Sequence, residues 1–158
     1  MAYVGVVGPS SADERELHDA EVLGRGLAER GHVVVCGGLG GVMAAAAGGA
    51  SAAGGVVVGL LPGTDRSAAN PGVTVAIPTG LGELRNALLV RSSDVVVSVG
   101  GSWGTLSEVA MALRAGVRVV AIRGWRLSTA DGQEVDDGSR AVSSADEALT
   151  LLDRLLSS

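Results

Sequence analysis

The feature that most constrains the fold is a glycine-rich loop that recurs after three Val-rich runs. These loops lie at 8–11, 37–43 and 100–105, and each is followed by a helical pattern. An apolar run, a glycine turn and a helical period indicate a strand that feeds a helix. Repeated along one chain, this pattern predicts parallel strands whose carboxyl ends meet at one edge of a sheet, where open α/β folds bind ligands.

Helical patterns and apolar runs alternate along the rest of the chain. Helices are expected at 13–31, 41–53, 81–93, 104–115 and 144–156. Strands are expected at 3–7, 33–36, 55–61, 73–77, 95–99 and 117–122, with a short last strand at 140–142 after a polar loop at 124–138. The runs lack strict alternation, as in strands covered on both faces. We therefore predict one Rossmann-like α/β domain over residues 1–158, doubly wound around a mainly parallel sheet.

Charge and hydropathy argue against nucleic-acid and membrane partners. The net charge is −5 and no basic cluster is present, whereas nucleic-acid affinity depends on neutralising phosphates. The segment 42–61 has no charge over a length that could span a bilayer, but its first half is rich in Ala and Gly and its second half in Val. A helix followed by a strand explains this segment better than a membrane span.

Other absences narrow the chemistry. The chain contains no lysine, which disfavours pyridoxal-phosphate and P-loop enzymes. His18, His32 and Cys36 have no spacing typical of a metal site, so no metal ligands are expected. Cys36 at the end of a strand is interpreted as a small core residue. A single cysteine forms no internal disulfide, and the apolar run at 3–7 lacks a basic region before it, so a cytoplasmic location is expected.

The segment from Gly100 to Glu108 is the leading candidate for a ligand site. Glycines let the backbone approach a ligand, and Thr105 with the first amides of a helix can bind a phosphate beside Glu108. Arg85 can clamp a phosphate or carboxylate. The structural alternatives are an ordinary glycine loop and a solvated or ion-paired arginine. Trp103 either stacks on a ligand ring or packs beneath the loop.

The expected ligand-binding residues come from all three loops and from the helix at 81–93. They are Gly8, Ser10, Gly37, Gly38, Gly41, Met43, Arg85, Asn86, Gly100, Gly101, Ser102, Trp103, Gly104, Thr105 and Glu108.

Several motifs within residues 3–123 resemble a known family. These are Gly37-Gly38-x-x-Gly41-Val42-Met43, Leu61-Pro62-Gly63, the pair Arg85 and Arg91, Asp94, and Gly104-Thr105-x-x-Glu108. The chain resembles the Rossmann proteins once labelled lysine decarboxylase-like (the LOG/SLOG superfamily), which include cytokinin-activating phosphoribohydrolases and molybdenum cofactor carrier proteins. In the phosphoribohydrolases the matching arginine and glutamate are catalytic, so the resemblance implies catalytic roles for Arg85 and Glu108 if this chain is such an enzyme.

Three departures from the phosphoribohydrolase motif favour the carrier branch. Gly100 replaces a proline, Ser102 replaces a glycine, and Asn86 replaces a lysine. Lysine decarboxylation is excluded, because the enzyme behind that old label needs a lysine that this chain lacks.

Two functions therefore remain open. The favoured one is binding or carrying a phosphorylated, nucleotide-like small molecule; no cofactor is required, and the resemblance implies the molybdenum cofactor or a nucleotide as the bound molecule. The alternative is a phosphoribohydrolase that splits nucleoside 5′-monophosphates into base and ribose 5-phosphate. Apolar positions in the helices at 81–93 and 104–115, together with the resemblance, predict a homodimer or homotetramer.

Overall fold

The strands and helices of this protein alternate almost strictly along the chain. The structure is a computed structural model that describes residues 1–157. Its strands are β1 (Tyr3–Val7), β2 (Val33–Cys36), β3 (Val57–Leu61), β4 (Val75–Pro78), β5 (Val95–Val99), β6 (Arg118–Ile122) and β7 (Arg140–Val142). Its α-helices are α1 (Glu14–Glu29), α2 (Val42–Ala52), α3 (Arg85–Arg91), α4 (Trp103–Arg114) and α5 (Ala145–Leu156).

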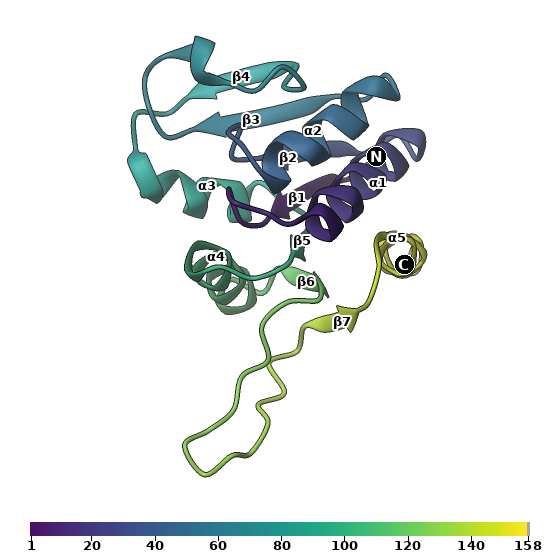
Figure 1. Ribbon diagram of the computed structural model, residues 1–158, viewed down its shortest axis with the longest axis vertical. Helices are drawn as coiled ribbons and strands as arrows, with labels where there is room; N and C mark the ends of the chain where they lie inside the picture. The colour runs from purple at the N-terminus through teal and green to yellow at the C-terminus, as the bar shows by residue number, and fades with distance from the viewer. Residues whose placement is uncertain (158) are drawn as a thin grey trace.

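The strands form one seven-stranded sheet in the order β4-β3-β2-β1-β5-β6-β7, and every pairing is parallel. The predicted doubly wound α/β sheet is confirmed. From β1 the chain moves outward to β4, then returns to place β5 on the other side of β1 (Figure 1). This reversal creates a switch point between β1 and β5, where the loops that follow the two strands diverge and leave a crevice.

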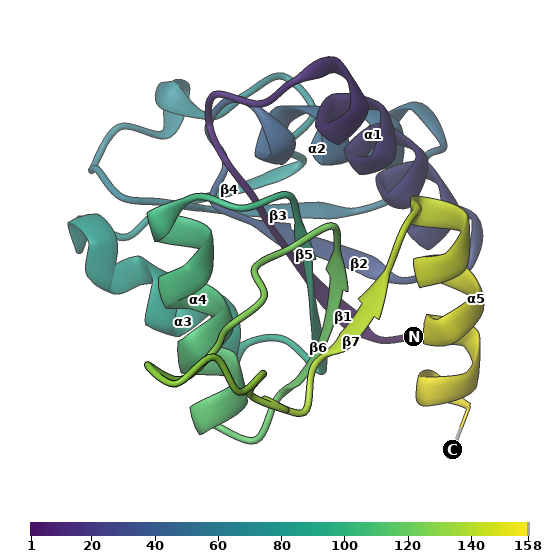
Figure 2. The same cartoon turned by 60° about the horizontal axis from the view of Figure 1, so that its bottom comes forward.

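Helices cover both faces of the sheet. One buried cluster joins the strands to α1, α2 and α5, and the other joins them to α3 and α4. Figure 2 shows α5 and α4 on opposite sides of β6 and β7. Alternate residues of β5 supply the two clusters: Val95, Val97 and Val99 face the first, and Val96 faces the second. Burial of both faces explains the continuous valine runs.

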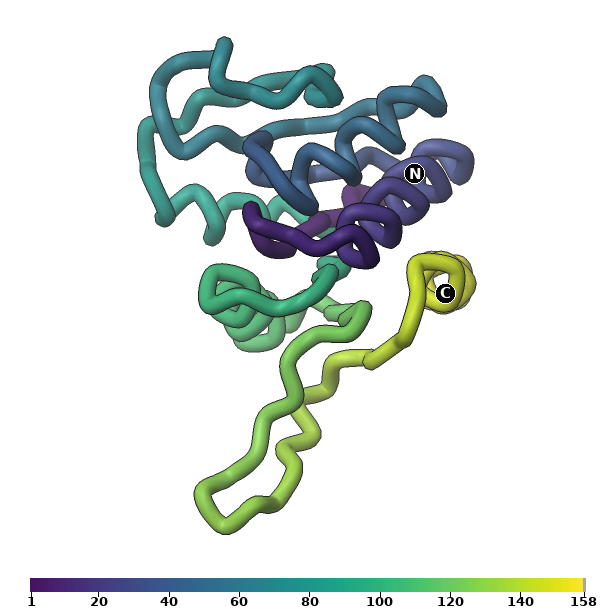
Figure 3. The backbone as a smooth tube through the Cα atoms, viewed as in Figure 1, coloured from purple at the N-terminus to yellow at the C-terminus, as the bar shows by residue number. Residues whose placement is uncertain are grey.

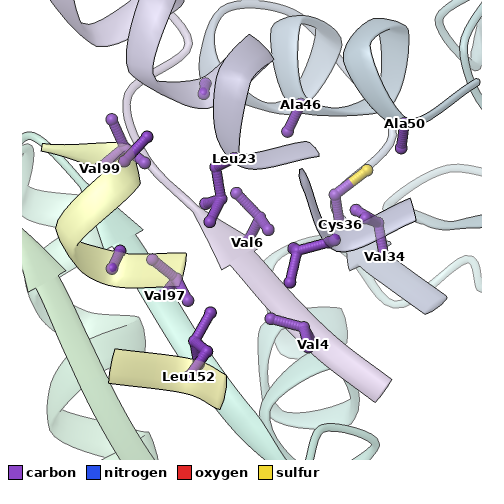
Figure 4. Close-up of a cluster of buried hydrophobic side chains, with 14 of the residues drawn as sticks. Val4, Val6, Leu23, Val34, Cys36, Ala46, Ala50, Val97, Val99 and Leu152 are labelled. Atoms are coloured by element: carbon purple, nitrogen blue, oxygen red, sulfur yellow. The ribbon is translucent and has the colours of Figure 1, made fainter. Parts of the chain in front are cut away.

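The larger cluster depends on small residues where α1 crosses α2. Added at Gly24 or Gly49, a Cβ atom would collide with the backbone of the other helix. Small side chains such as Ala46 and Ala50 fill the space between α2 and the strands, and Figure 4 shows them beside Leu23 and Cys36. The composition of α2, rich in Ala and Gly, therefore reflects close helix packing.

The uncharged segment 42–61 forms α2 and β3. Within residues 1–157, no helix is long and apolar enough to cross a membrane.

One helix starts later than the sequence-based expectation, and the loop expected before the last strand is present but folds back on itself. The helix predicted from residue 81 begins at Arg85, after a 3-10 turn at Gly82–Leu84, because Gly80 and Gly82 both adopt positive φ. The polar loop predicted at 124–138 is a hairpin that projects away from the sheet (Figure 3). One isolated antiparallel bridge joins Ser128 to Glu134, and Val135 donates its amide to the Leu127 carbonyl over 2.9 Å.

Candidate functional site

A cavity of about 380 Å³ opens at the switch point. It lies at the carboxyl ends of β1 and β5, where the fold predicts a ligand site. Its wall combines the loops after β1, β2 and β3 with the first turns of α2, α3 and α4. The lining residues are Val6, Val7, Gly8, Ser10, Gly37, Met43, Pro62, Gly82, Glu83, Arg85, Asn86, Leu89, Ser102, Gly104, Thr105 and Glu108.

The structure brings most of the residues expected at the site into this one cavity. Those that line it are Gly8, Ser10, Gly37, Met43, Arg85, Asn86, Ser102, Gly104, Thr105 and Glu108. Sequence reasoning missed Val6, Val7, Pro62, Gly82, Glu83 and Leu89. Pro62 was within reach, because it follows a strand at the same edge, and so were Gly82 and Glu83, because they precede Arg85. The sequence pattern predicts ordinary core positions for Val6, Val7 and Leu89, so nothing in it marks them as site residues.

The other expected residues do not line the cavity: Gly38, Gly41, Gly100, Gly101 and Trp103. Among these, Gly41 fixes how two loops meet. It has φ +63°, and a Cβ there would collide with the Pro9 and Ser10 carbonyl oxygens. The neighbouring Val42 amide donates to the Pro9 carbonyl over 3.1 Å. The loops after β1 and β2 therefore touch backbone to backbone.

Arg85 is held between two strand ends. Its Nη1 donates to the carbonyl oxygens of Gly37 and Leu60, each over 2.5 Å, so the side chain fastens the end of β2 to β3. Its Nε is buried without a hydrogen-bond partner. Burial lowers the pKa of the Arg85 guanidinium, and the nearby Glu108 carboxylate opposes that shift. The cation is thus fixed in place rather than free in solvent.

Glu108 faces the same cavity from the second turn of α4. Burial raises the pKa of its carboxyl group to about 7, although the positive charge of Arg85 opposes the shift. At neutral pH the group is therefore divided between its acid and carboxylate forms. A carboxyl group poised in this way can donate or accept a proton.

The amino end of α4 is already capped. Ser102 is its N-cap, and the Ser102 hydroxyl accepts the Thr105 amide over 3.2 Å. The same hydroxyl lies 2.9 Å from the buried Thr105 hydroxyl. The N-cap of α2 is Gly41, which has no side chain to cap the helix, and the Val42 amide donates to the Pro9 carbonyl. Because each helix start leaves further first-turn amides, the amino ends of both α2, beside Met43, and α4, beside Gly104, face the cavity.

Trp103 lies on the surface. Its side chain is 76% exposed, so it does not pack beneath the loop. Its ring centroid lies 5.1 Å from that of Trp125, with the planes inclined at 34°. Trp125 also donates its indole N–H to the Ser102 carbonyl over 3.0 Å. This pair ties the hairpin at 124–138 to the start of α4.

Neither histidine nor Cys36 belongs to the cavity. Cys36 is buried in the core, as interpreted from the sequence, and burial raises its thiol pKa to about 11. His32 accepts the Ala2 amide on Nδ1 over 3.1 Å. Among residues 1–157, no cluster of three or more His, Cys, Asp or Glu side chains is arranged to hold a metal ion.

Comparison with known proteins covers nearly the whole chain. The family model "SLOG cluster4 family" matches residues 1–151. An uncharacterized protein of Archaeoglobus fulgidus is 44% identical over 123 residues, which cover 78% of this chain and 81% of that protein.

Several solved structures of 30% identity or more share the fold. The molybdenum cofactor binding protein from the phototrophic bacterium Rippkaea orientalis is 34% identical, with a TM-score of 0.89 over 98% of this chain and 97% of that one. The molybdenum cofactor carrier protein from Chlamydomonas reinhardtii is 30% identical, with a TM-score of 0.85 over 99% of each chain. The resemblance found in the glycine-rich motifs is confirmed: this chain belongs to the SLOG cluster4 family.

Proposed function

We propose that this protein binds and carries a phosphorylated pterin or nucleotide-like molecule, with the molybdenum cofactor as the leading candidate. The observation that carries the proposal is a pair of buried polar atoms at the cavity without protein partners, Arg85 Nε and Asn86 Oδ1. Buried polar atoms are almost always hydrogen-bonded, so a donor and an acceptor left open at one cavity indicate a ligand that supplies both. Pterin and nucleobase edges carry adjacent donors and acceptors.

The size and electrostatics of the cavity suit such a molecule. Its volume of about 380 Å³ lies within the range of small-molecule sites, roughly 300–1,000 Å³. The amino ends of α2 beside Met43 and of α4 beside Gly104 would hold the phosphate, because helix amino ends carry open amides and partial positive charge. Arg85 and Asn86 would hold the ring. The similarity to molybdenum cofactor binding and carrier proteins supports this ligand class.

Calorimetric titration with a phosphorylated pterin, and with the same pterin lacking phosphate, tests this proposal. We expect the phosphorylated compound to bind at least about tenfold more tightly, since only its phosphate engages the helix amino ends at the cavity. The variant Asn86→Leu keeps a similar volume but removes the acceptor, so it should weaken binding of both compounds about tenfold. Failure of every phosphorylated pterin and nucleotide to bind the folded protein would refute the proposal.

Phosphoribohydrolase activity is the second candidate, favoured by Glu108. A carboxyl group with a pKa of about 7 beside a fixed arginine could activate water or protonate a leaving base. The products would be a free base and ribose 5-phosphate, with water supplying the hydroxyl group. Chromatography of nucleoside 5′-monophosphates after incubation with the parent and with Glu108→Gln tests it. Base release by the parent alone would establish the enzyme; no release from any nucleotide would exclude it for the panel tested.

We further propose that the protein self-associates through the outer face of α3 and α4. Leu84 and Leu88 are 73% and 41% exposed, and Met111 lies partly buried in the groove between the two helices. Exposed leucines on adjacent turns are costly to leave in water. A symmetric (isologous) contact between two copies would bury these leucines on both subunits. A homodimer or homotetramer is the expected assembly.

A further inference from the structure

A second cavity, of about 250 Å³, lies along a different face of α4. The first cavity receives Thr105 and Glu108, whereas the second receives Leu106, Val109 and Leu113. The spacing of these three residues places them on one stripe of the helix. Trp125 and Leu127 from the hairpin form the opposite wall. The second cavity therefore has largely apolar walls from two separate segments, with Asp137 and Ser139 at the hairpin side, and does not belong to the proposed carrier site.

The sheet forms the floor of this second cavity. Ser98 of β5 and Ala121 of β6 line it, and both side chains are small. On this face α4 covers β5, while α5 packs on the opposite face of the sheet (Figure 2). The part of the sheet that α4 does not cover is therefore bounded by the hairpin, and a hollow remains between α4 and the hairpin.

Ser98 gives this hollow a polar base. It is the one polar residue in β5, and its side chain is only 1% exposed. Ser98 lines the second cavity, and its buried hydroxyl has no hydrogen-bond partner among the described residues. Valine occupies every other position of β5, so apolar packing alone does not account for a hydroxyl here. A buried hydroxyl without a partner indicates a missing hydrogen-bonding group.

We propose that this cavity binds a small aromatic molecule that carries one hydroxyl or N–H group, of about the size of phenol or indole. An apolar cavity of about 150 Å³ is large enough for benzene, so this one admits one or two fused rings. The rings would lie between the α4 leucines and Trp125, and the single polar group would meet Ser98. A phosphorylated or other anionic ligand does not suit it, because no cationic side chain lines the cavity and the carboxylate residue Asp137 does.

A chain of residue contacts also links the second cavity to the first. Trp125 lines the second cavity and donates its indole N–H to the Ser102 carbonyl. Ser102 in turn lines the first cavity and caps α4. A ring bound against Trp125 would therefore be reported by the fluorescence of that residue, and Trp103→Phe leaves Trp125 as the only tryptophan for the measurement.

Titration of the protein with phenol and with toluene tests the inference, because the two rings differ only in the hydroxyl and the methyl group. We expect phenol to quench or shift Trp125 emission and to bind about tenfold more tightly than toluene. The variant Ser98→Ala should weaken phenol about tenfold and leave toluene unchanged. Ser107→Ala, which removes an exposed hydroxyl of α4 outside both cavities, is the matched control and should change neither.

A third variant, Ala110→Phe, fills the cavity from an exposed position of α4 and should abolish binding of both compounds. Equal binding of phenol and toluene by the parent protein, or unchanged phenol binding by Ser98→Ala, would overturn the proposal. So would sedimentation data showing that the protein associates and that Ala110→Phe makes it monomeric, since a second copy would then be the occupant of this groove.

Discussion

Arg85 and Glu108 reach the same cavity from different helices, and each shifts the pKa of the other toward the charged form. Burial acts in the opposite direction on both groups and is the larger effect. Because Arg85 is bonded to the carbonyls of Gly37 and Leu60, its charge cannot move away from Glu108 without releasing the ends of β2 and β3. The acidity of Glu108 is thus set by the sheet as well as by its own helix.

Replacing the arginine should therefore change the glutamate. In Arg85→Met the opposing positive charge is lost, and we expect the pKa of Glu108 to rise above about 7. Carbon-detected NMR titration of the Glu108 carboxyl group measures this directly. A pKa that stayed the same or fell would show that the two groups do not interact. The same variant should bind phosphorylated ligands more weakly.

Glu108 should also make stability depend on pH. Its pKa in the folded protein, about 7, lies above its ordinary value of 4.5, so folding favours the protonated form. The stability that this group contributes is complete below about pH 4.5 and is lost as pH rises through 7. We expect Glu108→Gln to gain on the order of 3 kcal/mol in stability relative to the parent as pH rises between those limits. Urea unfolding at several pH values tests this, and a difference independent of pH would contradict it.

Removing the Ser102 hydroxyl should have two separable effects. As the N-cap of α4, Ser102→Ala should lower the free energy of unfolding by about 1 kcal/mol. Ser144→Ala, at the matching N-cap of α5, should cost a similar amount. Ser102 lines the first cavity whereas Ser144 does not, so only Ser102→Ala should also change ligand affinity. Equal affinities for the two variants would place the ligand away from α4.

Introducing a charge on the outer face of α3 should dissociate the proposed oligomer into monomers. We expect Leu88→Asp to lower the sedimentation coefficient to that of a monomer, because burying an unpaired carboxylate in an apolar contact is unfavourable. Val56→Asp, at a 47% exposed position outside α3 and α4, should leave the assembly unchanged. A parent protein that is monomeric at tens of micromolar would refute the proposed contact.

The positions of the strands and of the ligand-side loops could be predicted because they rest on local signals. A valine run followed by glycine indicates a strand end wherever it occurs, and the parallel order then gathers those ends. The contacts of Arg85 could not be predicted in the same way. They join α3 to carbonyls that lie 48 and 25 residues away, and a backbone carbonyl carries no sequence signal.

The start of α4 shows a different limit. Anion binding by Thr105 and the first helix amides stays a prediction, but the structure shows a partner that sequence reasoning did not assign: the Ser102 hydroxyl, as N-cap, accepts the Thr105 amide. Trp103 depends on Trp125, which lies in a hairpin whose path the sequence left open. In both cases several groups could be the partner of the same atom or ring, and sequence motifs do not show which of them makes the contact.

The cavity has two unlike halves, and the backbone contact at Gly41 lies beside one of them. On the side of β1 and β2, main-chain atoms of the two loops touch directly, so a side chain at Gly41 would force the loops apart. On the side of α3 and α4, the wall consists of side chains such as Glu83, Asn86 and Glu108. Substitutions that change which ring the cavity accepts can therefore occur on the side of α3 and α4. The side formed by the loops after β1 and β2 tolerates fewer changes and would stay the same for different ligands.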